Sequence, residues 1–349
     1  MQGIVVIQTA FLGDIVLASG FLRTLRKRNP GARITFVTTE IGKEILSPNP
    51  WNLDIVVFDK RGEDKGWKGF WRIVEAVRQG KKADAAYCLH RYLRSSLLAR
   101  FVARKVYGFR EAAGAFLYSQ RVTHADYTFE SERYLALLGD YSRDDLLPEL
   151  HFSDADREAG EALLAELGGA PFLAIAPSSV WATKRWQAEK FAAVARWAWK
   201  KHNIRSVILG GPDATDRNVA GQVAYYYVHV QGGTKQLEGI PLNLSGQTSL
   251  GTLKYVISRA KAVVANDSAP LHIAIAMDRP VVGVFGPTTK AAGFFPLGKE
   301  GETDYAEIDL YCRPCGRHGH NRCPEAHFRC MVELPATVVQ AKLESFLCR

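Results

Sequence analysis

Three polar turns in this sequence follow apolar runs and carry side chains that could bind or transfer groups. The first turn, residues 9–13, leads to Asp14 at the start of a helical pattern. An Asp at a helix start is commonly a cap, but the helix dipole also biases such a carboxylate towards its ionised form. Asp14 is therefore a candidate general base, and the sequence leaves both roles open.

The second turn, residues 177–186, is rich in hydroxyl groups and basic side chains. It contains Ser178, Ser179 and Thr183 and continues into Lys184 and Arg185. Hydroxyls and backbone N–H groups beside a lysine can hold a diphosphate without a dedicated metal cage. A solvated basic loop is the other interpretation of the same residues.

The third turn leads from an apolar run into a helix. Asp267 and Ser268 are expected to cap this helix, and Pro270 fits its first turn because a missing N–H costs little there. The amides of Ser268 and Ala269, together with the helix dipole, form an anion site suited to phosphate oxygens. His272, one turn further on, is either a ligand of the same group or a structural residue.

Weaker signals come from two further stretches. Asp213 and Asp216 follow paired glycines and could accept hydrogen bonds from ribose hydroxyls. No GxGxxG or GxxxxGK[ST] fingerprint occurs, which disfavours a dehydrogenase or a P-loop nucleotidase. The DxD motif at residues 154–156 would suggest a metal-bound nucleotide sugar, but Ser153 and Asp156 instead predict a capping box at a helix start.

Cysteines are concentrated near the C-terminal end of the sequence, where a CxxC pair precedes two more. Disulfides are disfavoured in the cytoplasm, so this pattern raises tetrahedral zinc as a structural metal. The spacing of the second pair matches no standard finger or ribbon, and reduced, packed thiols are the other interpretation. The four residues are Cys312, Cys315, Cys323 and Cys330.

Length and composition indicate a globular protein of two domains. The chain has 349 residues, of which 47% are hydrophobic and 23% charged, and domains of about 150 residues are typical. No apolar run approaches the roughly 18 to 20 residues of a membrane span. The N-terminus lacks the basic lead and cleavage site of a signal peptide, so we expect a cytoplasmic protein.

The positive charge is concentrated in the first half of the chain. The net charge is +9, and residues 60–121 contain fifteen Lys and Arg against five Asp and Glu. Such a field favours an acidic partner: nucleic acid, an anionic membrane surface or a phosphorylated substrate. A basic surface that serves only solubility is the alternative.

Apolar runs alternate with helical patterns along almost the whole chain, which is typical of βα units around parallel sheets. The polar passage at residues 139–169 predicts a linker and the first helix of a second domain, which divides the chain into residues 1–150 and 151–349. Ligands of doubly wound sheets bind at the carboxyl ends of the strands, where the three turns lie. Strands are expected at 3–8, 33–39, 54–59, 83–89, 105–109, 172–177, 206–211, 262–267 and 280–285.

Four stretches together resemble one family. They are "GDIVLASGFLRTLRKRNPGARITFVT", "APSSVWATKRWQAEKF", "NDSAPLHIAIAMDRPVVGVFGPT" and the Cys-rich "CRPC" to "CPEAHFRCM". In this order they resemble the ADP-heptose:lipopolysaccharide heptosyltransferases, glycosyltransferase family 9, and "TKRW" is more similar to the heptosyltransferase II type. Many relatives have Gly where Ala269 stands, and its methyl group would narrow the approach of a phosphate.

The resemblance implies an α/β protein with a GT-B fold, in which two Rossmann-like, doubly wound parallel sheets face a central crevice. It implies an inverting glycosyl transfer without a catalytic metal or other cofactor, at the cytoplasmic face of the inner membrane. The first domain would bind the acceptor and the second the ADP-sugar, and the C-terminal helix is a candidate to pack back on the first domain. The partners implied are ADP-heptose, the lipopolysaccharide inner core with its lipid A, and an anionic membrane surface, but not nucleic acid.

Site residues follow from the same resemblance at matching positions. Asp14 would be the general base, and Lys184 would stabilise the departing ADP. Donor contacts would come from Ser178, Ser179, Thr183, Lys184, Asp213, Asp216, Asp267, Ser268, Ala269 and His272. Acceptor contacts are expected from Thr9, Gly13, Arg91 and Arg94.

Three other functions are compatible with the same residues. A related GT-B transferase would use a different nucleotide sugar or acceptor, and a sugar-nucleotide epimerase would need no separate acceptor. A binding protein without catalysis would be unaffected by loss of the Asp14 carboxylate. Acceptor dependence of ADP release separates these alternatives.

Overall fold

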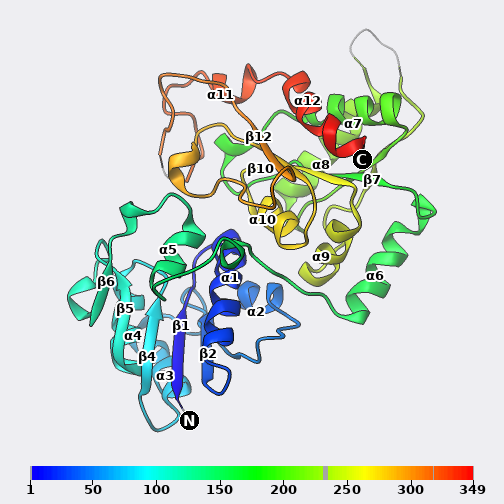
Figure 1. Cartoon of the computed structure of the whole chain (residues 1–349). Coiled ribbons are helices and arrows are strands. Elements are labelled where there is room, and N and C mark those ends of the chain that lie inside the picture. Colours follow the sequence, from blue (N-terminus) through cyan, green and yellow to red (C-terminus); the bar gives the residue numbers. More distant parts are fainter. Residues whose placement is uncertain (1, 231–234, 317, 349) are drawn as a thin grey trace. The chain divides into compact units, whose positions relative to one another are not determined.

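The computed structural model describes residues 2–230, 235–316 and 318–348. The chain divides into two compact units, Met1–His151 and Phe152–Arg349. Each unit is built around its own parallel sheet of six strands (Figure 1). The units are therefore described one at a time.

The sheet of the first unit has the strand order β3-β2-β1-β4-β5-β6. All neighbouring strands are parallel. The order reverses direction between β1 and β4, and ligands of doubly wound sheets bind beyond the carboxyl ends of such a pair. The strands are β1 (Gly3–Ile7), β2 (Arg33–Thr38), β3 (Asp54–Val57), β4 (Ala83–Cys88), β5 (Ala103–Phe109) and β6 (Gln120–Val122).

Helices cover both faces of this sheet. Val5 and Ile7 of β1 belong to a core shared with α3 and α4. On the opposite face, Phe21 of α1 meets Tyr87 of β4 edge-on, with ring centroids 5.5 Å apart. The helices are α1 (Leu12–Arg28), α2 (Glu40–Ile45), α3 (Gly66–Arg78), α4 (Leu93–Val102) and α5 (Glu130–Ala136).

The second sheet repeats the topology of the first. Its order is β12-β11-β10-β7-β8-β9, so the reversal lies between β7 and β10, and their pairing is parallel. The candidate turns after residues 176 and 266 thus follow the two strands at the switch point. The strands are β7 (Phe172–Ala176), β8 (Arg205–Ile208), β9 (Leu242–Asn243), β10 (Ala262–Asn266), β11 (Val281–Val284) and β12 (Thr303–Ala306).

The helices of the second unit include the C-terminal helix α12. The sequence left open its return to the first domain, but its Val339, Leu343 and Phe346 belong to the core formed with α7, α8 and the second sheet. Ser153 and Asp156 form the capping box of α6, as predicted. The helices are α6 (Asp154–Leu164), α7 (Ala188–His202), α8 (Ala214–Val228), α9 (Leu250–Arg259), α10 (Ala269–Ala276), α11 (Arg329–Val332) and α12 (Ala336–Leu347).

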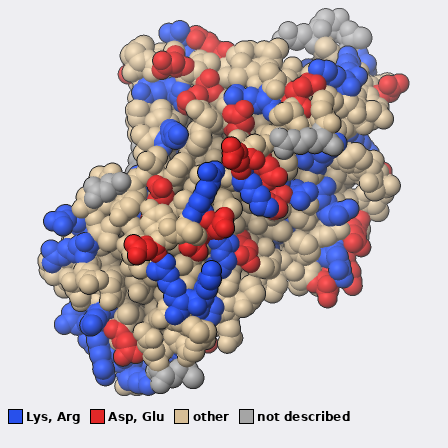
Figure 2. Space-filling model, viewed as in Figure 1, with Lys and Arg blue, Asp and Glu red and all other residues tan. Residues whose placement is uncertain are grey.

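Lys and Arg are numerous on the surface of the first unit. On β5 and β6, Arg104, Lys105 and Arg121 are exposed. Figure 2 shows basic side chains gathered along the margin of the unit that carries these strands. Among the described residues, none of the helices is both long and apolar enough to span a bilayer.

Candidate functional site

The first group of candidate residues lies where β1 ends. Asp14 is the third residue of α1, and the N-cap is Phe11, so the interpretation of Asp14 as a plain cap is wrong. Its carboxylate instead contacts α5, because the Tyr134 hydroxyl donates to Asp14 Oδ1 at 3.4 Å. Gly13 precedes it in the same helical turn.

Asp14 titrates near neutrality. Burial of the carboxyl, followed by the negative charge of Glu130, raises the pKa of Asp14 to about 7. Hydrogen bonds from the start of α1 and from Tyr134 act in the opposite direction but are outweighed. The helix dipole therefore does not decide the charge state, contrary to the expectation from sequence.

A buried polar network behind Asp14 was not found from the sequence. Tyr134 is completely buried, and its hydroxyl accepts a hydrogen bond from Gln8 Nε2 at 2.9 Å. Glu130 forms a buried ion pair with Arg133 at 2.7 Å. Burial alone would raise the pKa of Glu130, but hydrogen bonds from His124 and Arg133 hold it below the usual range. The Glu130 carboxylate therefore stays ionised, and its negative charge acts on the Asp14 carboxyl.

Basic residues surround the ends of β1, β3 and β4. Lys60 donates a hydrogen bond to the Thr9 hydroxyl, and burial, with the charge of Arg94, lowers the pKa of Lys60 to about 8. Burial also lowers the pKa of His90 to about 3, so its ring is neutral at physiological pH. Lys60 is the residue of this group that sequence reasoning missed.

The two candidate arginines differ in what they contact. Arg94 donates to the carbonyls of Asp64 at 2.7 Å and Gly66 at 3.0 Å, and it lies over the Phe58 ring. It therefore holds the turn before α3. The Arg91 guanidinium, which is partly exposed, makes no hydrogen bond or ion pair with another residue that the structure describes.

In the second unit, Lys184 and Asp267 form a buried ion pair at the ends of β7 and β10. Lys184 Nζ lies 2.5 Å from Asp267 Oδ2, and the Thr288 hydroxyl donates to the same oxygen at 2.6 Å. The helix cap is Ser268, whose side chain makes no capping bond. The prediction that Asp267 also caps α10 is wrong, because its carboxylate faces Lys184 instead.

Several polar groups at this edge have no partner among the residues that the structure describes. Ser178 Oγ and His272 Nδ1 are buried without a hydrogen bond to any described residue. Burial lowers the pKa of His272 to about 4, so the ring is neutral. Within the described chain, the backbone N–H groups of Ser268 and Ala269 also donate to no protein atom. Buried polar atoms are rarely left unsatisfied, so this edge is suited to a polar ligand.

Asn266 holds the two turns of this edge together. It is completely buried, accepts a hydrogen bond from the Trp186 N–H at 3.1 Å and donates to the Pro177 carbonyl at 2.6 Å. The sequence analysis gave Asn266 no role. The signal that would have identified it is a polar amide at the end of an apolar run, next to the Asp of the turn.

Other predicted donor residues bond to the protein itself. The Thr183 hydroxyl donates to the His320 carbonyl at 2.9 Å and accepts from its N–H at 2.8 Å. Asp213 caps α8, while Asp216 accepts from the Gly211 N–H at 2.7 Å. Ser179 is buried and offers its carbonyl to Arg185 at 2.7 Å. These contacts explain the conformations of the loops.

The four C-terminal cysteines gather without forming a closed metal site. Burial and the neighbouring thiols, Cys315 first, raise the pKa of Cys330 to about 11. Burial, Cys312 and Cys323 likewise raise the pKa of Cys315. No three of their ligand atoms all lie within 4.8 Å of one another. The described side chains of the four cysteines therefore do not form a closed tetrahedral set of ligands. One other group of described residues meets this criterion.

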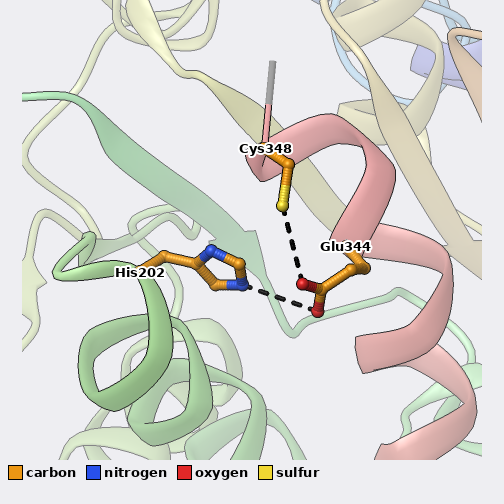
Figure 3. Close-up of side chains that lie close together, drawn as sticks. All are labelled: His202, Glu344 and Cys348. Atoms are coloured by element: carbon orange, nitrogen blue, oxygen red, sulfur yellow. Dashed lines mark hydrogen bonds and ion pairs between the residues drawn. The ribbon is translucent and has the colours of Figure 1, made fainter.

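That other group is His202, Glu344 and Cys348, at the ends of α7 and α12 (Figure 3). Glu344 Oε2 lies 3.6 Å from His202 Nε2 but only 2.9 Å from the Lys201 ammonium. Because α7 ends just before β8 begins, this group lies at the amino edge of the sheet, opposite Lys184. The lysine neutralises the carboxylate, so we assign no metal to it.

Two tandem doubly wound sheets, each with polar residues at its switch point, are the architecture of the GT-B fold. This is the fold class that the sequence predicted. The chain belongs to glycosyltransferase family 9 (heptosyltransferase), whose family model matches residues 70–321.

Individual relatives agree with this placement. The lipopolysaccharide core heptosyltransferase OpsX of Haemophilus influenzae is 24% identical over 306 residues, which are 81% of this chain and 79% of that protein. A solved family 9 glycosyl transferase from Veillonella parvula has a TM-score of 0.82 at 23% identity, with 99% and 97% of the two chains covered. The E. coli ADP-heptose LPS heptosyltransferase II has a TM-score of 0.77 at 22% identity, with 100% and 99% covered.

Proposed function

We propose that this glycosyltransferase moves L-glycero-D-manno-heptose from ADP-heptose to the inner core of lipopolysaccharide, with inversion at the anomeric carbon. The observation that carries the proposal is the Asp14 carboxyl at the end of β1, with a pKa of about 7. A base with such a pKa is half ionised at neutral pH and can take a proton from a sugar hydroxyl. The names of the relatives support heptose as the transferred sugar.

The reaction that we propose is a single displacement. Asp14 takes the proton of the acceptor hydroxyl as its oxygen forms a bond to the anomeric carbon of the heptose. The bond from that carbon to the β-phosphate oxygen breaks, and its electron pair leaves with ADP. The Lys184 ammonium and the N–H groups of Ser268 and Ala269 would stabilise the charge that develops on the diphosphate.

The remaining donor contacts are assigned by their free hydrogen-bonding capacity. Ser178 and the neutral His272 ring would bond the donor, because their buried polar atoms have no partner among the described residues. Asp213 and Asp216 each use one carboxylate oxygen to accept a backbone N–H near the start of α8. We propose that the other oxygen of each accepts a hydrogen bond from a ribose hydroxyl. Arg91 and Thr9 would contact the acceptor. We assign the first unit to the acceptor and the second to ADP-heptose, at the cytoplasmic face of the inner membrane.

The experiment that tests this function is release of ADP from ADP-heptose, with and without a truncated lipopolysaccharide acceptor, in the presence of EDTA. We expect release that depends on the acceptor and persists in EDTA. Release without an acceptor would favour a hydrolase, and conversion of the sugar without release of ADP would favour an epimerase. Loss of release in EDTA would show that the reaction needs a metal. A heptose-bearing acceptor that outperforms one ending in Kdo would assign the heptosyltransferase II type.

We expect kcat/KM to fall tenfold per pH unit below about pH 7, because protonated Asp14 cannot act as a base.

Two variants should shift this acidic limb in opposite directions. Glu130→Gln removes a charge that raises the pKa of Asp14, so the acidic limb should move to lower pH. Tyr134→Phe removes a hydrogen bond that lowers this pKa, so the limb should move to higher pH. Initial rates from pH 5 to 9 measure both shifts, and identical limbs in all three enzymes would rule out Asp14 as the titrating base.

Metal content tests the zinc interpretation of the cysteines. We expect well below one equivalent of zinc per chain after purification without chelator, because the thiols do not converge. Elemental analysis gives the ratio directly. One equivalent of zinc in the native protein that is lost in Cys315→Ser would instead establish a structural metal at the four cysteines.

A further inference from the structure

Large apolar side chains are exposed on the turns and helix starts that follow β3, β4 and β5 in the first unit. They include two tryptophans and a phenylalanine, which are usually at least partly buried in soluble proteins. We call this set the aromatic edge. Its members and their exposed fractions are Trp67 (66%), Trp71 (47%), Tyr92 (66%), Leu93 (45%) and Phe116 (72%).

The aromatic edge is held together by contacts between its elements. Trp71 of α3 packs on Phe101 of α4, with ring centroids 4.8 Å apart. The bond from Arg94 to the Gly66 carbonyl, at 3.0 Å, ties the start of α4 to the start of α3. A Cβ on Gly114 would lie 3.3 Å from Leu93 Cδ1, so the segment leading to Phe116 runs against the start of α4. These residues therefore belong to one rigid part of the unit.

Positive charge accompanies these side chains. Arg61, Lys65 and Lys68 are exposed beside Trp67. The nearby Asp64 is buried and paired with Arg72 at 2.6 Å. Glu63 is exposed and lies 3.4 Å from the same arginine, so three exposed basic side chains stand beside one exposed carboxylate between positions 61 and 68.

We propose that the aromatic edge inserts into the headgroup region of an anionic phospholipid bilayer. Amphipathic aromatic rings favour the membrane interface, and lysines beside them are attracted to anionic lipids. The exposed Arg61, Lys65 and Lys68 beside Trp67 supply the charge that complements such a surface. The inference rests on the proposed function, because the acceptor proposed there is attached to a lipid.

Docking through this edge would also deliver the acceptor to the site. Thr9, Lys60 and Arg91 follow β1, β3 and β4, and Trp67 and Tyr92 follow the same β3 and β4. In a parallel sheet the carboxyl ends of neighbouring strands lie on one edge. A sugar attached to a lipid in the bilayer would therefore reach the basic residues without leaving the membrane surface.

Vesicle flotation of the full-length protein tests the proposal. We expect binding to vesicles that contain phosphatidylglycerol and weaker binding to pure phosphatidylcholine. Trp67→Ser with Phe116→Ser should weaken binding to the anionic vesicles by at least about tenfold, because two large apolar side chains no longer insert. The matched control is Tyr225→Ser with Leu237→Ser, which removes two exposed apolar side chains of the second unit and should leave binding unchanged.

Transfer assays separate this proposal from the proposed function. With a delipidated, soluble acceptor, the Trp67 and Phe116 double variant should match the native enzyme, and it should be slower only with an acceptor embedded in vesicles. A native enzyme that transfers heptose to the soluble acceptor but binds no vesicles would overturn the docking proposal alone. Vesicle binding without any transfer would overturn the function alone. Unchanged flotation of the double variant would show that this edge does not bind lipid. If the native protein proves to be a dimer in solution and the double variant a monomer, the edge is instead an interface between two copies of the chain, and the proposal is overturned.

Discussion

Asp14→Asn is expected to lower kcat by a factor of about 10² to 10⁴, the usual contribution of a positioned general base. The amide keeps the shape of the side chain and can still accept the hydrogen bond from Tyr134, which lies 3.4 Å from Oδ1. It cannot take a proton from the acceptor hydroxyl. Initial rates of ADP release at saturating donor and acceptor measure the loss.

Two controls accompany the Asp14 variant. The dissociation constant of ADP-heptose, measured by calorimetry, should be unchanged, because Asp14 belongs to the unit that we assign to the acceptor. Thermal stability at pH 8 should not fall, since burial disfavours the charged carboxylate that the amide replaces. An Asp14→Asn enzyme with native kcat would contradict the assignment of the base.

Lys184→Met should lower kcat by about 10² to 10³, because one donor to the developing diphosphate charge is lost. The same change removes the partner of Asp267, which lies 2.5 Å away and is only 4% exposed. Breaking a buried ion pair from one side typically costs about 3 to 5 kcal/mol. Urea denaturation should therefore show a clear loss of stability in this single variant.

The double variant Lys184→Met with Asp267→Asn separates the two effects. Removal of both charges should restore most of the stability, since no uncompensated carboxylate remains. The activity should remain low, because the ammonium is still absent. Recovery of kcat together with stability would show that Lys184 only neutralises Asp267.

Thr288→Val is the matched control, because it removes one hydrogen bond to Asp267. It should lower the free energy of unfolding by about 1 kcal/mol and keep kcat within a few fold.

The regular parts of the fold could be predicted from the sequence because their buried positions carry apolar residues at regular intervals. Leu17, Phe21 and Leu25 repeat along one side of α1 and are all buried, and Asn29 is the C-cap of the helix. The short edge strands β6, β9 and β12 were missed. They have two to four residues each and are paired on one side only, so no continuous apolar run marks them.

The site could be predicted only where its residues are local in sequence. Lys184 and Ser268 stand in the polar segments that follow β7 and β10, and His272 lies one turn into α10. Tyr134 lies far from Asp14 in the sequence, and only folding brings α5 against the start of α1. The pKa of Asp14 likewise depends on burial and on Glu130, neither of which is visible from the residues around position 14.

Every strand of the structure pairs within its own sheet, and both sheets have the same strand order. Among the described residues, neither sheet contains a strand of the other unit. Substitutions that alter the edge around Thr9 and Lys60 therefore leave the backbone pairing around Lys184 and Asp267 intact. If the first unit binds the acceptor and the second the donor, as we propose, evolution can change the acceptor specificity while the donor specificity is kept, and the two can diverge at separate rates.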